Sequence, residues 1–193
     1  MLRMTSEYVR VHPCSIVRGC FLFNASREVL VVRKDFSSSA FILGATPKNR
    51  AMYDHFVNGV PWEETGIIDE VLYLRNVKSR ENNLPYPRRD DVLYRYRALD
   101  GVFEDIKAGK FDENKGSPIN VAIGRDNEIF FCGNGWHRLW ICQHLAIESI
   151  PCRIVARHVD SAVVPTYVKE VSVSRYFLGK WCGCLRQALS KLV

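Results

Sequence analysis

One continuous stretch, residues 119–158, constrains the fold more than any other part of the sequence. Its first residues alternate, with Ile119, Val121 and Ile123 on one face, and turn residues separate them from a second apolar run, which is typical of a β-hairpin. After a glycine-containing loop, apolar residues recur at the three- and four-residue spacing of a helix. The stretch therefore predicts, in order, strand 119–123, turn 124–127, strand 128–132, loop 133–135, helix 136–143 and strand 150–155.

The loop before the helix, Gly133-Asn134-Gly135, has a chemical consequence. The first turn of a helix presents N–H groups without partners, and the helix dipole favours an anion there. Glycines let the backbone approach a ligand closely. Arg138 brings a fork of donors suited to phosphate or carboxylate, and His137 can donate a hydrogen bond or move a proton. The segment predicts a phosphate cradle; the alternative is an ordinary strand-to-helix turn with a surface arginine and a packed histidine.

Several motifs in this order resemble the ParB/sulfiredoxin superfamily over roughly residues 93–160. They are Leu99-Asp100, the helical piece 106–110, the hairpin 119–129, Asn134–Leu139 and Ile150–His158. The resemblance implies an α+β fold with a ParB/sulfiredoxin-like mixed sheet and flanking helices. It also implies a nucleotide-binding loop made of Gly133, Asn134, Gly135, Trp136, His137 and Arg138, with Arg157 and His158 facing the same crevice.

Within that superfamily, the residue before the His-Arg or Arg-Arg pair differs between proteins of different activity. Sulfiredoxins have a cysteine where this chain has Trp136, and partition proteins, which bind CTP, have Gly-Glu-Arg-Arg. Free-serine kinases have Asp-Gly-His-His-Arg; this chain keeps Gly135, His137 and Arg138 but has Asn134 in place of the aspartate. The resemblance therefore implies an ATP-binding phosphotransferase, a kinase of the transferase class, that acts on a small-molecule acceptor. It would use ATP or another nucleoside triphosphate, with Mg²⁺.

Three acids and one histidine are candidates for the catalytic work. Glu63, Glu64 or Asp100 would take the proton of the acceptor, and His137 would donate to phosphate or shuttle a proton. Two acids at a helix start are also favoured by the helix dipole alone, and Asp100 could equally be a helix cap. The alternative function is a nucleotide-responsive or DNA-binding module without turnover, similar to partition proteins. No spacing in the sequence predicts a metal-ligand set.

Composition sets the remaining limits. The formal net charge of +6 favours an anionic partner, with local density at Arg88-Arg89 and Arg95-Tyr96-Arg97, so nucleic acid is a further candidate beside a nucleotide. No apolar run is long enough to span a membrane. Cysteines sit singly in apolar positions, which is typical of buried thiols in a reducing compartment and favours a cytoplasmic location.

Outside the central stretch, the sequence predicts an extension on each side of a core at 92–160. The N-terminal extension, 1–91, packs on the core and contains a β-hairpin at 14–35, a helix from Pro47 to about Val57, a helix or strand at 67–74 and a loop at 78–91. A helix covers 92–110. The C-terminal extension, 161–193, has a β-prone run and an amphipathic helix at 174–192, which docks on the domain or makes peripheral contact with a membrane or partner.

Overall fold

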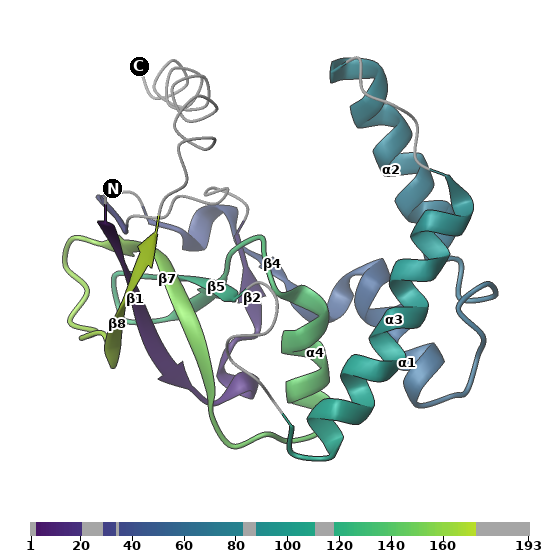
Figure 1. The fold of residues 1–193 in the computed structure, drawn as a ribbon. Coiled ribbons are helices and arrows are strands. Elements are labelled where there is room, and N and C mark those ends of the chain that lie inside the picture. Colours follow the sequence, from purple (N-terminus) through teal and green to yellow (C-terminus); the bar gives the residue numbers. More distant parts are fainter. Residues whose placement is uncertain (1–2, 21–28, 34, 83–87, 111–117, 173–193) are drawn as a thin grey trace.

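The computed structural model describes residues 3–20, 29–33, 35–82, 88–110 and 118–172. These residues form an α+β fold with one mixed sheet and four α-helices (Figure 1). In chain order the elements are β1 (Arg3–Val11), β2 (Arg18–Gly19), β3 (Leu30–Val32), β4 (Phe41–Ile42), α1 (Pro47–Phe56), α2 (Ile67–Asn82), α3 (Arg89–Lys107), β5 (Ile119–Ile123), β6 (Ile129–Phe131), α4 (Trp136–His144), β7 (Ile150–His158) and β8 (Tyr167–Ser172).

The sheet has the strand order β4-β2-β6-β5-β7-β1-β8, and β3 pairs beside it with the end of β7. The hairpin predicted at 119–132 is confirmed, because β5 and β6 pair antiparallel. β5 also pairs parallel with β7, with Ile119 opposite Cys152 and Ile123 opposite Arg157. Strands from the first fifth of the chain therefore lie in the same sheet as the strands of the central stretch.

Among the described residues, the two strand segments of the hairpin predicted at residues 14–35 do not pair with each other, and residues 21–28, which include its turn, lie outside the described residues. β2 pairs parallel with β6 on one side and antiparallel with β4 on the other, whereas β3 pairs parallel with β7. Apolar β-prone residues indicate that a segment fits a pleated, half-buried surface, but they do not specify its partner strand. Both segments instead complete a sheet whose centre is built by residues more than a hundred positions later in the chain.

The helix predicted from Pro47 is confirmed, with Thr46 Oγ1 accepting a hydrogen bond from the N–H of Asn49 at 3.3 Å and Pro47 at the first helical position. Residues 67–74 belong to a helix, α2, which continues to Asn82. Residues 78–82 and 89–91, predicted as loop, are therefore helical. The predicted helix 174–192 lies outside the described residues.

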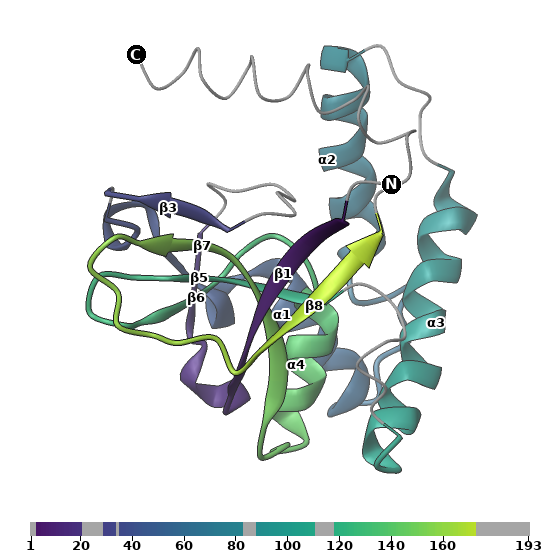
Figure 2. The ribbon, with the colours of Figure 1, turned by 60° about the vertical axis from the view of Figure 1, so that its left-hand side comes forward.

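Helices α1, α3 and α4 gather on one side of the sheet, and α4 stands between the sheet and α3 (Figures 1 and 2). The main core lies there and includes Val121, Ile123, Ile141 and Ile154. A smaller cluster on the other side includes Phe36 and Phe130. No helix among the described residues is long and apolar enough to cross a bilayer.

Candidate functional site

The predicted glycine loop leads from β6 into α4 as expected, and its backbone requires glycine. Gly133 and Gly135 have φ of 76° and 87°, and Gly135 is the N-cap of α4. A Cβ at Gly135 would stand 2.7 Å from the Cα of Ile119, closer than real Cβ atoms approach. The N–H of Asn120 donates to the carbonyl of Asn134 at 3.0 Å, which fixes the loop against β5. The first turn of α4 is therefore held at the Ile119 end of the β5–β7 pair.

Trp136, the first residue of α4, makes protein contacts with its ring and its nitrogen. Its ring is parallel to that of Phe41 at 6.0 Å and meets Phe131 edge-on. Its Nε1 donates to Asn49 Oδ1 at 2.7 Å, and Lys48 Nζ lies 5.7 Å from the ring centre. Trp136 therefore joins the first turn of α4 to the first turn of α1, and this contact brings Lys48 close to His137.

His137 lines a cavity of about 420 Å³ among α1, α2, α3 and α4, which we call the His137 cavity. It is lined by Lys48, Val71, Leu74, Arg75, Val92, Tyr94, Arg95, Tyr96, Ala98, Leu99 and His137. Three of these described lining residues are cations and none is acidic. A concave surface with positive charge and no carboxylate attracts an anion.

His137 itself is neutral at physiological pH. Burial, with the positive charges of Lys48 and Arg95 acting in the same direction, lowers its pKa to about 4. Nε2 is buried and has no hydrogen-bond partner among the described residues. The ring meets the Tyr96 ring at right angles, 5.4 Å between centres, and burial raises the pKa of Tyr96 to about 12. The site thus holds an imidazole with a buried Nε2 that makes no hydrogen bond to a described residue, and such buried atoms call for an explanation.

One exposed aromatic side chain belongs to the lining of the same cavity. Tyr94, on α3, is 76% exposed. An exposed aromatic ring offers a surface on which a planar ring can stack. The lining of the His137 cavity therefore combines three cations with one exposed tyrosine.

The structure does not bring the three candidate acids to this cavity. Glu63 pairs with Arg97, and a hydrogen bond from its own backbone N–H together with Arg97 holds the pKa of Glu63 below its usual range. Glu64 is exposed. Asp100 Oδ1 accepts hydrogen bonds from Trp62 Nε1 at 2.9 Å and His55 Nε2 at 3.1 Å. Because these carboxylates neither converge nor line the cavity, the residues there do not fit a protein-bound Mg²⁺.

Arg157 and His158 lie away from the glycine loop. Arg157 pairs with Ile123, five residues along β7 from Cys152, which is roughly 16 Å at ~3.3 Å per residue. Its guanidinium faces the Glu7 carboxylate at 3.8 Å. His158 is 1% exposed, and both of its ring nitrogens are hydrogen-bonded to backbone. The predicted crevice shared by these residues and the loop is therefore not formed.

Arg138 follows His137 in the first turn of α4, but it is not among the residues that line the His137 cavity. The cations that do line it, Lys48, Arg75 and Arg95, were not predicted as site residues. Two sequence signals pointed to them. Lys48 stands in the first turn of a helix, where a cation opposes the dipole, and Arg95 belongs to the predicted dense basic stretch. Their convergence depends on helix packing, which the sequence pattern does not reveal.

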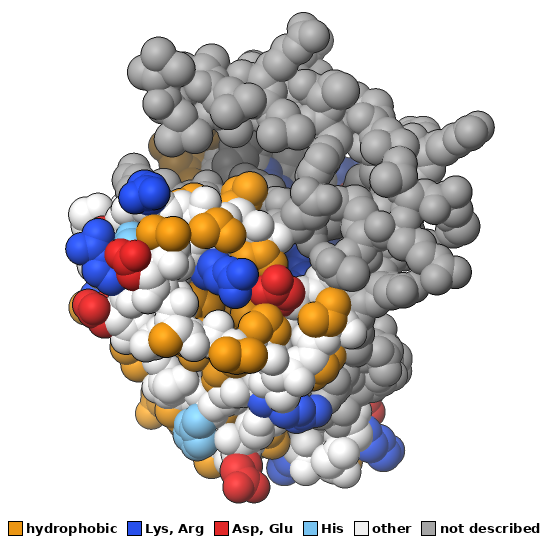
Figure 3. Space-filling model, turned by 90° about the vertical axis from the view of Figure 1, so that its left-hand side faces the viewer, with side chains coloured by type: hydrophobic (Ala, Val, Ile, Leu, Met, Phe, Trp, Pro, Cys, Tyr) orange, Lys and Arg blue, Asp and Glu red, His pale blue; other side chains and the backbone are white. Residues whose placement is uncertain are grey.

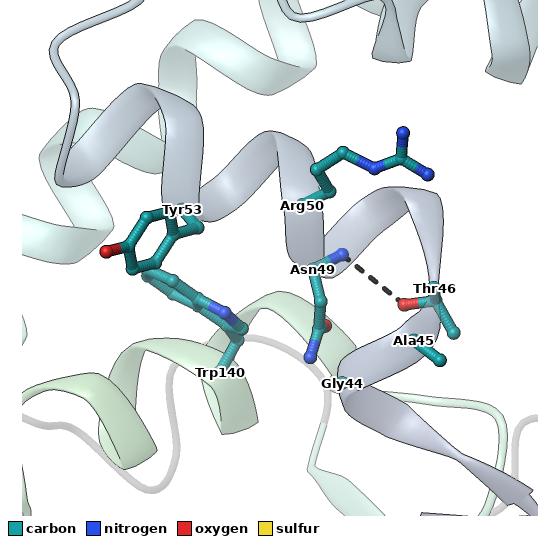
Figure 4. Close-up of a pocket in the computed structure, with 7 residues that line it drawn as sticks. All are labelled: Gly44, Ala45, Thr46, Asn49, Arg50, Tyr53 and Trp140. Carbon is teal, nitrogen blue, oxygen red and sulfur yellow. Dashed lines mark hydrogen bonds between the residues drawn. The ribbon is translucent and has the colours of Figure 1, made fainter.

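A second concave surface is lined by residues of α1, of the segment just before it and of α4 (Figure 4). This groove, with a volume of about 520 Å³, is lined by Gly44, Ala45, Thr46, Asn49, Arg50, Tyr53 and Trp140. We call it the Trp140 groove. It receives residues from α1 and α4 and none of the residues predicted from the sequence.

Comparisons with known proteins add no relative to this description, since no family model, no curated protein and no solved structure matches the chain. The resemblance to the ParB/sulfiredoxin superfamily therefore stays a prediction.

Proposed function

We propose that the protein binds a nucleotide in the His137 cavity, with ATP as the first ligand to test. The observation that carries this proposal is the lining of the cavity, which has three cations, a histidine whose buried Nε2 has no described partner, and no acid among its described residues. Its volume of about 420 Å³ is in the range of small-molecule sites, about 300–1,000 Å³.

The phosphates would lie at the end of the cavity near Lys48, Arg95 and His137. Both cations are close enough to act on the His137 ring, so one phosphate group could contact all three side chains. His137 stands in the first turn of α4, so the positive end of the helix dipole adds to the charge of these cations. The base would lie toward Tyr94, whose exposed ring offers a stacking surface.

Calorimetry with ATP, ADP, CTP and GTP tests this proposal. Lys48→Met and Arg95→Met each remove one cation and keep an apolar stem, and we expect each to weaken binding about tenfold or more. Lys107→Met, a change on the exposed part of α3, is the matched control and should leave affinity unchanged. If no nucleotide binds, or if the control weakens binding as much as the cavity variants, the proposal fails.

Transfer of a phosphoryl group from that nucleotide is the more demanding part of the prediction. It needs a base and a metal-binding carboxylate, and Glu63, Glu64 and Asp100 do not line the cavity. The phosphotransferase activity therefore stays a prediction that binding alone does not establish. Release of ADP in the presence of candidate acceptors, compared with the His137→Leu variant, measures it directly.

The alternative function, a nucleic-acid-binding module, is favoured by one observation. Exposed Tyr94 lines the same cavity as Arg75 and Arg95, and aromatic side chains beside basic ones bind single strands. On the sheet side of the molecule, which Figure 3 shows and which faces away from α2 and α3, the described basic side chains are separated by acidic and apolar ones. A fluorescent single-stranded oligonucleotide tests this alternative. Tighter binding of the oligonucleotide than of ATP, together with weaker binding of the oligonucleotide by Arg95→Met, would favour it.

A further inference from the structure

The three cations of the His137 cavity come from three helices and act on one pair of rings. Besides burial, which is the largest cause, the charges of Lys48 and Arg95 both lower the pKa of His137. Burial raises the pKa of Tyr96, and the charges of Arg95 and Arg75 both oppose that rise. The rings of Tyr96 and His137 lie 5.4 Å apart between centres. The three positive charges therefore act at the same place in the cavity, around these two rings.

Two of these cations have no counterion within the described part of the chain. Helices α2 and α3 lie side by side (Figure 1), and Arg97 of α3 pairs with Glu63. Arg95, two residues earlier on α3, and Arg75 on α2 form no ion pair with a described residue. No described lining residue is acidic. The positive charge of the cavity is therefore left for a ligand to neutralise.

Mg²⁺ is the ion that usually supplies positive charge to a polyphosphate in a protein. It binds phosphate oxygens and is held to the protein through one or two carboxylates. The described lining of the His137 cavity has cations in place of such carboxylates. A triphosphate chain carries about four negative charges at neutral pH, and a bound Mg²⁺ cancels two of them. On phosphates in this cavity, Mg²⁺ would also stand among like charges, which repel it.

We propose that the His137 cavity binds the metal-free form of a polyphosphate and that Mg²⁺ on the phosphates weakens binding. This inference rests on the proposed function and specifies which form of the nucleotide the cavity takes. Three protein cations neutralise the phosphate oxygens in place of the ion, and the neutral His137 ring donates from Nε2 without adding a charge. Phosphoryl transfer relies on Mg²⁺ to neutralise the phosphates, so this preference is expected of a site that binds a nucleotide without turnover.

Calorimetry with ATP on the full chain tests the proposal in two buffers of equal ionic strength, one free of divalent cations and one with Mg²⁺ in excess over ATP. We expect ATP to bind about tenfold more weakly in the Mg²⁺ buffer. Arg75→Met removes one of the three cations from an exposed position on α2, and the effect of Mg²⁺ should fall to about threefold. Lys48→Met, on another helix, gives a second measurement of the same ratio. Lys107→Met removes an equal charge at the end of α3 and should keep the wild-type ratio.

The two buffers separate this proposal from the proposed function. Weaker binding with Mg²⁺, reduced in Arg75→Met and Lys48→Met, supports the proposal. Equal or tighter binding of ATP with Mg²⁺ overturns it and leaves the nucleotide site standing. An unchanged ratio in both cavity variants also overturns it, because the preference would then not come from the cations of the cavity. If ATP binds in neither buffer, the proposed function fails and this proposal fails with it.

Discussion

Two histidines were predicted to bind phosphate, and the structure places them in opposite situations. His158 is 1% exposed; its Nε2 donates to the carbonyl of Arg33 at 3.0 Å, and its Nδ1 accepts from the N–H of Asp160 at 3.1 Å. The neutral ring with its proton on Nε2 satisfies both contacts. His137 instead has a buried Nε2 without a described partner. A histidine that is fully partnered holds the fold together, whereas one with an unused buried nitrogen is a candidate for a ligand.

The largest expected effect comes from making the same change at both histidines. His158→Leu leaves the Arg33 carbonyl and the Asp160 N–H without their partner, and we expect a loss of roughly 2–4 kcal/mol in the free energy of unfolding. His137→Leu removes a buried nitrogen that has no partner, so we expect stability at pH 7 to stay within about 1 kcal/mol. Urea unfolding of both variants measures the difference, and a larger loss for His137→Leu would reverse the comparison.

The second prediction concerns pH. Because His137 has a pKa of about 4 in the folded chain and about 6.5 when unfolded, the unfolded state takes up more protons between these values. Stability is therefore unaffected by this group above about pH 6.5, falls as the pH is lowered, and reaches its full loss below about pH 4, up to about 3 kcal/mol.

Urea unfolding from pH 7 to pH 4 tests this dependence, with His137→Leu as the reference. The variant should lose less stability on acidification than the wild type, while carboxylates contribute equally to both. If the free energy of unfolding falls equally with pH in the wild type and in His137→Leu, His137 is not held neutral in the folded chain. If a phosphate ligand is bound, the added negative charge favours protonation, so ATP should raise the pH at which His137 titrates in NMR.

The elements predicted correctly are those that local pattern determines. The hairpin of β5 and β6, helix α4 and strand β7 follow from periodicity, turn residues and glycines within one continuous stretch. The partner strands of β2 and β3 were not predicted, because the choice of a partner strand is a long-range property. β1 was not predicted, yet it lies between β7 and β8, and β3 pairs with a strand far along the chain.

The same distinction applies to the site. The glycine loop and His137 were found because a backbone that needs positive φ selects glycine locally. The cations came from three helices, with Lys48 on α1, Arg75 on α2 and Arg95 on α3, so only packing brings them together. Glu63 could not be assigned from the sequence, because an acid at a helix start looks the same whether it is catalytic or paired with Arg97.

A smaller effect is expected at Asp100, which the family resemblance marks as functional. Asp100→Asn keeps an acceptor for Trp62 but removes the charge that His55 contacts, so we expect a loss of about 1–2 kcal/mol in stability. Nucleotide affinity should not change, because Asp100 does not line the His137 cavity. Urea unfolding measures the stability of this variant, and calorimetry measures its nucleotide affinity. A large loss of nucleotide affinity without a loss of stability would show that Asp100 takes part in nucleotide binding.

The smallest effect is expected at Arg157, the neighbour of the partnered histidine. Its ion pair with Glu7 spans 3.8 Å, beyond hydrogen-bonding distance, and both side chains are partly exposed, so Arg157→Met should cost less than about 1 kcal/mol. Arg157 lies at the far end of β7 from the glycine loop, so calorimetry should give the wild-type affinity for ATP. Lys48→Met is the comparison, since it removes one charge inside the cavity. If Arg157→Met weakens ATP binding as much as Lys48→Met, the ligand extends along β7 and the family motif, rather than the His137 cavity, defines the site.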